Sequence, residues 1–230
     1  MKKLALIFAT AATLLVGCSK DDDNNNGGGN GNETVNYLPV KAGNTWTYKL
    51  TNLINNNTSN YTLTSTNSTK TINGKNFIEF TSSAGASLSE FYNIEGKSYT
   101  QYGNVANFNN LEFNYLAGNN NVGDKWVQTG IAAKVSGYDA TLNINYEIIN
   151  KLATTTVAGK TYNDVLVVKM TFSDLKIMGS VVTFKSQAAE IYIAKNIGKI
   201  KQSVNVEVNL PVSGNSFNST IELTDSKITL

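Results

Sequence analysis

The residue types that carry most enzyme chemistry are scarce in this sequence. Its 230 residues include no histidine, and Cys18 is the only cysteine. Serine–histidine–acid triads and histidine metal sites are therefore excluded. Carboxylates remain, but a glycoside hydrolase needs two of them across a cleft, and the candidates are spaced singly: Glu79, Glu90, Glu112, Asp124, Asp139, Glu147 and Glu190. We expect no catalytic residues, metal ligands or cofactor, and a carboxylate-dependent glycoside hydrolase is the least favoured function.

Two tryptophans are the remaining candidates for recognition. Trp46 and Trp126 each follow a Gly-Asn or Gly-Asp turn near the expected start of a strand. Exposed aromatic rings can stack on sugars, so both are candidate ligand-binding residues. The alternative is that both pack under the sheet and fix the first strand of a repeat. We favour packing, because equivalent placement is what a structural role would produce.

Cys18 follows a segment with the composition of a secretory signal. Lys2 and Lys3 precede an uncharged apolar run over residues 4–16, which is too short to span a bilayer. The sequence LVGC, residues 15–18, resembles the lipobox of bacterial lipoproteins, in which the cysteine is lipidated. We predict a signal peptide over residues 1–17 and a lipid anchor at Cys18, so the partners include a membrane and the lipoprotein processing and export machinery. An ordinary secretory signal with an incidental cysteine is the alternative.

Charged residues directly after the cysteine suggest where the anchor is sent. A lysine followed by three acids resembles the surface-export signal of Bacteroidetes lipoproteins: Lys20, Asp21, Asp22 and Asp23. The resemblance implies an outer-membrane lipoprotein exposed on the cell surface, and a periplasm-facing domain is the alternative. Residues 24–36 are rich in Asn and Gly and cannot bury enough apolar surface to fold. We expect residues 18–36 to form a flexible tether.

Charge and composition exclude one class of partner. Removal of residues 1–17 takes away two of the 19 basic residues and leaves 17, equal to the 17 acids. Every basic residue is lysine, so arginine, which makes bidentate contacts with phosphates and bases, is absent. We predict no nucleic-acid partner.

The sequence also contains a candidate internal repeat. Three pairs of segments occur in the same order: GNTW (43–46) with GDKW (123–126), NGKNF (73–77) with AGKTY (158–162), and EFY (90–92) with EIY (190–192). They predict a duplication, with one copy over about residues 37–110 and the other over about residues 111–230. Chance is the alternative for matches this short.

The domain that must position these residues, 37–230, has the pattern of an all-β fold. Ile200, Gln202, Val204, Val206 and Val208 alternate with polar residues, as in a strand with one dry face. A second run of five shares a face: Ala140, Leu142, Ile144, Tyr146 and Ile148. Turns at residues 178–180 and 196–198 predict antiparallel hairpins. We expect meander sheets that form a curved half-barrel or a β-sandwich.

Two segments carry a family resemblance. YLPVKAGNTWTY (37–48) and IYIAKNIGKI (191–200) resemble uncharacterised Bacteroidetes outer-membrane and surface lipoproteins with a repeated β domain. Asn196 departs from the glycine that is common there. The resemblance implies a lipid-anchored β domain and no particular activity.

Two functions from different classes therefore remain. The favoured one is a non-enzymatic surface binding or accessory lipoprotein with a glycan or protein ligand. The alternative is a carrier or sensor that holds a lipid or acyl chain in the concavity of a half-barrel.

Overall fold

A computed structural model describes residues 36–105, 108–209 and 216–230. The predicted signal peptide, Cys18, Lys20 and the three following aspartates lie outside the described residues. The strands of the described part are β1 (Thr45–Asn52), β2 (Thr58–Ile72), β3 (Lys75–Ser82), β4 (Glu90–Glu95), β5 (Ser98–Val105), β6 (Phe108–Leu116), β7 (Lys125–Val135), β8 (Tyr138–Val157), β9 (Lys160–Ile177), β10 (Ser180–Val181), β11 (Phe184–Ala194), β12 (Gly198–Val208) and β13 (Ser216–Lys227), with a 3-10 turn, η1 (Ala86–Leu88), before β4. The predicted all-β class is confirmed. No helix among these residues has the length and apolar character needed to cross a membrane.

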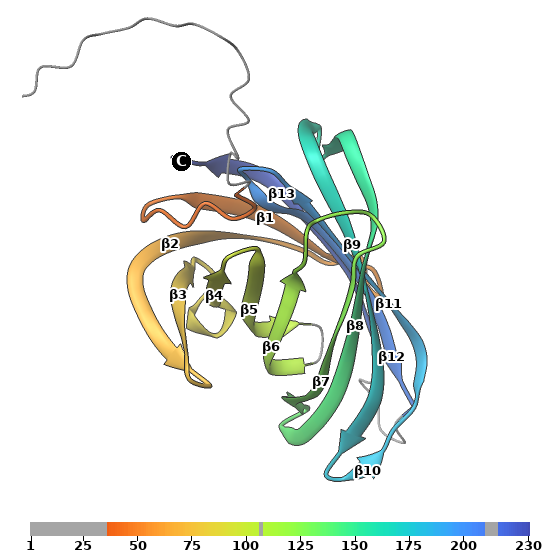
Figure 1. Ribbon diagram of the computed structural model, residues 1–230. Helices are drawn as coiled ribbons and strands as arrows, with labels where there is room; N and C mark the ends of the chain where they lie inside the picture. The colour runs from red at the N-terminus through yellow and green to blue at the C-terminus, as the bar shows by residue number, and fades with distance from the viewer. Residues whose placement is uncertain (1–35, 106–107, 210–215) are drawn as a thin grey trace, which may run out of the picture. The chain divides into compact units, whose positions relative to one another are not determined.

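The strands form one antiparallel sheet that closes on itself. Strands β1 to β9 each pair with the next, β9 also pairs with β11, and the order continues through β12 and β13 back to β1. Twelve strands therefore make a closed barrel, and β10 pairs only with the end of β9. Figure 1 shows the long strands β8, β9, β11 and β12 running side by side, while β2 to β6 curve round to face them.

The expected half-barrel or sandwich needs correction. The sheet closes where β8 pairs with β9. These two strands have 20 and 18 residues and pair along most of their length. Because β8 also bonds to β7 and β9 also bonds to β11, neither is left as a sheet edge. Alternating hydrophobicity shows which face is dry but not whether the edges meet, so the sequence could not decide closure.

Tight turns set the register of the long hairpins. Two adjacent residues have positive φ at the turn between β8 and β9, where Ala158 has φ 49° and Gly159 has φ 79°. The turn between β9 and β10 repeats this at Met178 (49°) and Gly179 (80°). Positive φ at both central residues is the geometry of the hairpin turns that match strand twist. The predicted hairpins at residues 178–180 and 196–198 are confirmed.

The interior of the barrel is filled mainly by large side chains. The five residues predicted to share the dry face of β8, Ala140 to Ile148 in alternation, are all at most 4% exposed. The same core contains aromatic rings from the shorter strands, including Trp46, Phe80, Tyr92 and Phe113. A barrel of twelve strands is wider than the eight-stranded kind that ordinary side chains can fill. Bulky aromatic residues occupy much of the extra width, and a cavity occupies part of the rest.

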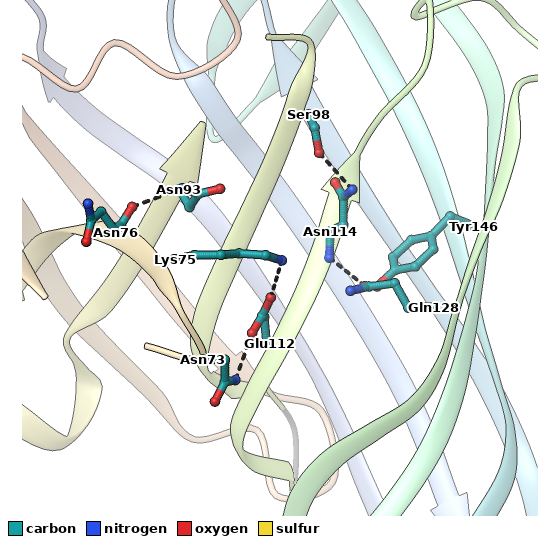
Figure 2. Close-up of polar contacts among 9 residues, drawn as sticks. All are labelled: Asn73, Lys75, Asn76, Asn93, Ser98, Glu112, Asn114, Gln128 and Tyr146. Carbon is teal, nitrogen blue, oxygen red and sulfur yellow. Dashed lines mark hydrogen bonds and ion pairs between the residues drawn. The ribbon is translucent and has the colours of Figure 1, made fainter. Parts of the chain in front are cut away.

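One stretch of the barrel wall is held by side chains. Strands β6 and β7 share only two residue pairs, next to Phe108. Further along, Trp126 Nε1 donates to the Asn114 carbonyl at 2.7 Å, and the Asn114 N–H donates to Gln128 Oε1 at 2.6 Å. Gln128 Oε1 also accepts from the Tyr146 hydroxyl of β8 at 2.6 Å (Figure 2). We call this stretch the β6–β7 seam.

Candidate functional site

A cavity of about 170 Å³ lies inside the barrel between the short strands and the β12–β13 wall. Much of its lining is apolar: Leu50, Tyr61, Val105, Val204, Phe217 and Ile221. Leu88 of η1, which is 43% exposed, and Ser89 also border it. Concave apolar space with a few convergent polar groups is the usual form of a small-molecule site. We call this space the barrel cavity.

Buried polar residues are concentrated around the barrel cavity. Nine polar or charged residues are buried in the described part of the chain, and five of them line this space: Glu90, Gln101, Lys199, Gln202 and Ser219. Burial of a polar group costs free energy unless its hydrogen bonds are replaced. Their convergence on one cavity therefore distinguishes it from the rest of the core.

A loose ion pair lies at the polar end of the cavity. Lys199 Nζ is 3.5 Å from Glu90 Oε2 and 3.4 Å from Gln101 Oε1, and the Tyr92 hydroxyl donates to Glu90 Oε2. Charge-assisted hydrogen bonds are normally about 2.7–2.9 Å long. The exposed pair of Lys160 with Asp225 reaches 2.7 Å, so the buried pair is the looser one.

Tyrosines surround the buried carboxylate. Burial, followed by the negative charge of Glu90, raises the pKa of Tyr48, Tyr61 and Tyr92 above the usual value of 10. Burial also raises the pKa of Tyr115, with smaller effects of Tyr99 and Glu90. These hydroxyl groups stay protonated at neutral pH; the Tyr92 hydroxyl donates to the Glu90 carboxylate, whereas the Tyr48 hydroxyl donates to the Lys199 carbonyl at 2.8 Å.

A β-bulge turns Lys199 into the barrel. The register of β11 and β12 shifts so that Tyr192 lies opposite Lys201 while Ile193 lies opposite Lys199, which leaves Ile200 as the extra residue. In a regular strand Lys199 would share the polar outer face with Lys201. Bulges commonly re-aim a side chain beside a functional site, and here the lysine becomes 6% exposed.

Two further polar side chains line the cavity without protein partners. Gln202 and Ser219 are each 4% exposed, and neither side chain has a hydrogen bond to another residue among those the structure describes. The two lie near each other on β12 and β13, where Gln202 pairs with Ile221 and Val204 pairs with Ser219. Together with Lys199 they present three hydrogen-bond donor groups to the same space.

The two candidate tryptophans have different surroundings. Trp46 is 1% exposed and donates its indole N–H to the Ile197 carbonyl at 2.7 Å, which is the packing role that we favoured. Trp126 is partly exposed at the β6–β7 seam, and its ring stacks on Tyr146 with centroids 5.1 Å apart. The structure does not bring the two rings to one site, since they lie on β1 and β7.

The seven candidate acids are also dispersed. Glu90 is the one that lines the barrel cavity. Five others have partners elsewhere: Glu112 with Lys75 and Asn73 (Figure 2), Asp124 with the backbone of Asn119 and Asn121, Asp139 with Lys134, Glu147 with Lys125, and Glu190 with Tyr192. A glycoside hydrolase would need a second carboxylate here, and the described lining contains none. Over the described residues, no group of three or more metal-ligating side chains is found.

Sequence reasoning missed the polar end of the cavity, although one signal was visible. Gln202 interrupts an otherwise apolar dry face between Ile200 and Val204, and a polar residue at such a position calls for a partner. Glu90 was counted only as one scattered acid. Lys199 had no signal, because the bulge that buries it leaves no mark in the alternation.

Comparisons with known proteins bear on the fold. No protein-family model matches the chain, and no curated protein matches it by sequence. One similar solved structure is a "putative lipoprotein" from Parabacteroides distasonis, with a TM-score of 0.51, 14% identity, and coverage of 85% of this chain and 100% of that one. Another is a "putative exported protein with YmcC-like fold" from Bacteroides fragilis, with a TM-score of 0.44, 9% identity, and coverage of 84% and 99%. The first likeness shows a shared fold.

Proposed function

We propose that this chain is a lipid-anchored, non-enzymatic binding protein that holds a small ligand with an apolar body and a polar end inside its barrel. The observation that carries the proposal is the gathering of five buried polar residues around an otherwise apolar cavity. The site resembles the alternative function derived from the sequence, a carrier or sensor for an acyl chain. Closure of the barrel moves that ligand from an open concavity to a cavity within the barrel, bordered by the exposed Leu88.

Cavity size limits the ligand. An apolar cavity of about 150 Å³ is large enough to hold benzene, and the barrel cavity measures about 170 Å³. It therefore accepts an aliphatic body of roughly six to eight carbons. A whole membrane lipid is too large for this space, so a short acyl compound or the end of a longer chain is the fitting occupant.

The anchor and the location are also part of the proposal. The lipobox-like sequence at Cys18 supports lipidation, and the charges at residues 20–23 support transfer to the outer membrane and the cell surface. A periplasm-facing domain on the same anchor is the alternative. The similar structure from P. distasonis bears the description lipoprotein, which agrees with this reading.

Occupancy of the cavity can be tested by filling it. Protein purified without detergent is analysed by native mass spectrometry, before and after addition of an eight-carbon amide. We expect a one-to-one adduct with the wild type and its loss in Val204→Phe combined with Ser219→Leu, because both substitutions add volume to facing positions of the lining. Val127→Phe on the exposed outer side of β7 is the matched control. Equal binding by the filled variant would show that the ligand binds elsewhere.

The anchor has its own test. Cys18→Ala removes the thiol that the lipid would modify, so we expect the protein to move from the membrane fraction to the soluble fraction. Cys18→Ala protein that stays with the membrane as fully as the wild type would overturn lipid anchoring. Protease accessibility on intact cells then separates surface exposure from the periplasm-facing alternative.

A second candidate function uses Trp126. Trp126 is partly exposed and lines a hollow of about 280 Å³ together with Lys125, Val127, Glu147 and Lys169. An aromatic ring beside charged groups can bind a glycan. Because Trp46 is buried, iodide quenching of tryptophan fluorescence reports mainly on Trp126. Protection from iodide by a glycan would support this candidate, and unchanged quenching across a glycan panel would oppose it.

A further inference from the structure

The charges at the polar end of the barrel cavity cancel each other. Lys199 and Glu90 contribute one charge of each sign, and they are the charged residues of the described lining. Both are at least nine-tenths buried, at 6% and 8% exposure. A buried charge is tolerated when an opposite charge and hydrogen bonds compensate it, and removal of that compensation is strongly unfavourable.

A charged ligand would disturb this balance. An anion that took Lys199 as its partner would leave Glu90 with the Tyr92 hydroxyl as its main donor. A cation that took Glu90 would leave Lys199 with Gln101, whose Oε1 is 3.4 Å away. In either case the site would hold an uncompensated charge in a poorly solvated space. A site of this kind therefore selects against ions of both signs.

An uncharged polar group meets no such penalty. Gln202 and Ser219 lack hydrogen-bond partners among the described residues, and each can both donate and accept. The loose contacts of Lys199 leave its ammonium able to donate to a further acceptor. A ligand head with one donor and one acceptor would satisfy these groups without displacing either charge.

We propose that the barrel cavity selects ligands whose polar end has no net charge and both donates and accepts hydrogen bonds, such as an amide or a hydroxyl group. This inference rests on the proposed function. The ion pair acts as a fixed dipole that recognises the head. The apolar wall formed by Val204, Phe217 and Ile221 receives the aliphatic body.

A ligand series of constant chain length tests the charge preference. Octanamide, octanoate and octylammonium share an eight-carbon body and differ mainly in the charge of the head. Titration calorimetry on the wild-type protein should give octanamide an affinity at least about tenfold higher than either ion, a difference of about 1.4 kcal/mol. Equal or tighter binding of either ion would overturn the charge preference while leaving the cavity as a ligand site. Absence of binding by all three would overturn the proposed function as well.

Two variants should invert the preference. Lys199→Met leaves Glu90 as the lone charge, so octylammonium should become the tightest of the three ligands. Glu90→Gln leaves Lys199 alone, so octanoate should become the tightest. Lys201→Met, on the next outward-facing lysine of β12, is the matched control and should keep the wild-type order. If the folded variants keep the wild-type order of ligand affinities, the charge preference does not come from Lys199 and Glu90. If a variant does not fold, the wild-type ligand series alone tests the preference.

Discussion

The buried pair of Lys199 and Glu90 offers a sharp test of the energetics. At 3.5 Å and an effective dielectric constant of about 20, two unit charges attract by about 5 kcal/mol. Breaking a buried pair from one side usually costs about 3–5 kcal/mol, because the other charge stays buried. The Tyr92 hydroxyl still donates to Glu90 after the lysine is removed, which favours the lower end of that range. We expect Lys199→Met to lower the free energy of unfolding by about 3 kcal/mol.

The assay is a double-mutant cycle in which the free energy of unfolding of each variant is measured by urea denaturation. For a domain of this size, 3 kcal/mol corresponds to a fall in Tm of about 6–12 °C. The double variant Lys199→Met with Glu90→Gln removes both charges, so we expect it to return to within about 1 kcal/mol of the wild type. If each single variant lowers the free energy of unfolding by less than about 1 kcal/mol, the pair contributes no more than an exposed salt bridge does. That result, or a double variant that loses the sum of both singles, would refute the reasoning.

Three further predictions concern other parts of the domain. Trp126→Phe keeps the ring but loses its hydrogen bond across the β6–β7 seam, so hydrogen exchange of β6 amides should accelerate and stability should fall by about 1 kcal/mol; unchanged exchange would contradict this. Gly198 has φ 101°, and a Cβ at this position would contact the Leu38 side chain. Gly198→Ala should therefore lower the free energy of unfolding, measured in urea, by about 1–3 kcal/mol. An unchanged free energy would show that the turn can relax. Buried tyrosines such as Tyr61 and Tyr92 keep their protons above pH 10 when folded, whereas unfolded tyrosines lose them. Stability should therefore fall as pH rises above 10, and the part of the 295 nm absorbance change that comes from these buried tyrosines should appear only on unfolding; ionisation of all tyrosines in the folded protein would contradict this.

Local pattern predicted the strands well. The alternation from Ala140 to Ile148 identified the buried face of β8, and the Gly179 turn was placed correctly. Both features depend on residues close in sequence, where side-chain periodicity and turn chemistry act directly. The proposed duplication remains a prediction, although Trp46 and Trp126 each occupy the second position of a strand after a similar turn.

Long-range features could not be read from the pattern. Closure of the barrel depends on β9 pairing with both β8 and β11, which no local signal encodes. The candidate site depends on a bulge that buries Lys199 and on Glu90 being brought opposite it from β4. Residues that look like ordinary surface charges in sequence thus became the polar end of a cavity.

The pairing of β1 with β13 has a consequence for how the chain folds. Thr45 lies opposite Lys227, so this contact spans most of the sequence, and the loop entropy lost in forming it is large. Domains dominated by such non-local contacts fold in about milliseconds to seconds. Until the last strand arrives, β1 has an open edge that can pair with other chains. The barrel is therefore complete only once β13 has paired with β1, and the preceding interval is the period of greatest risk of aggregation.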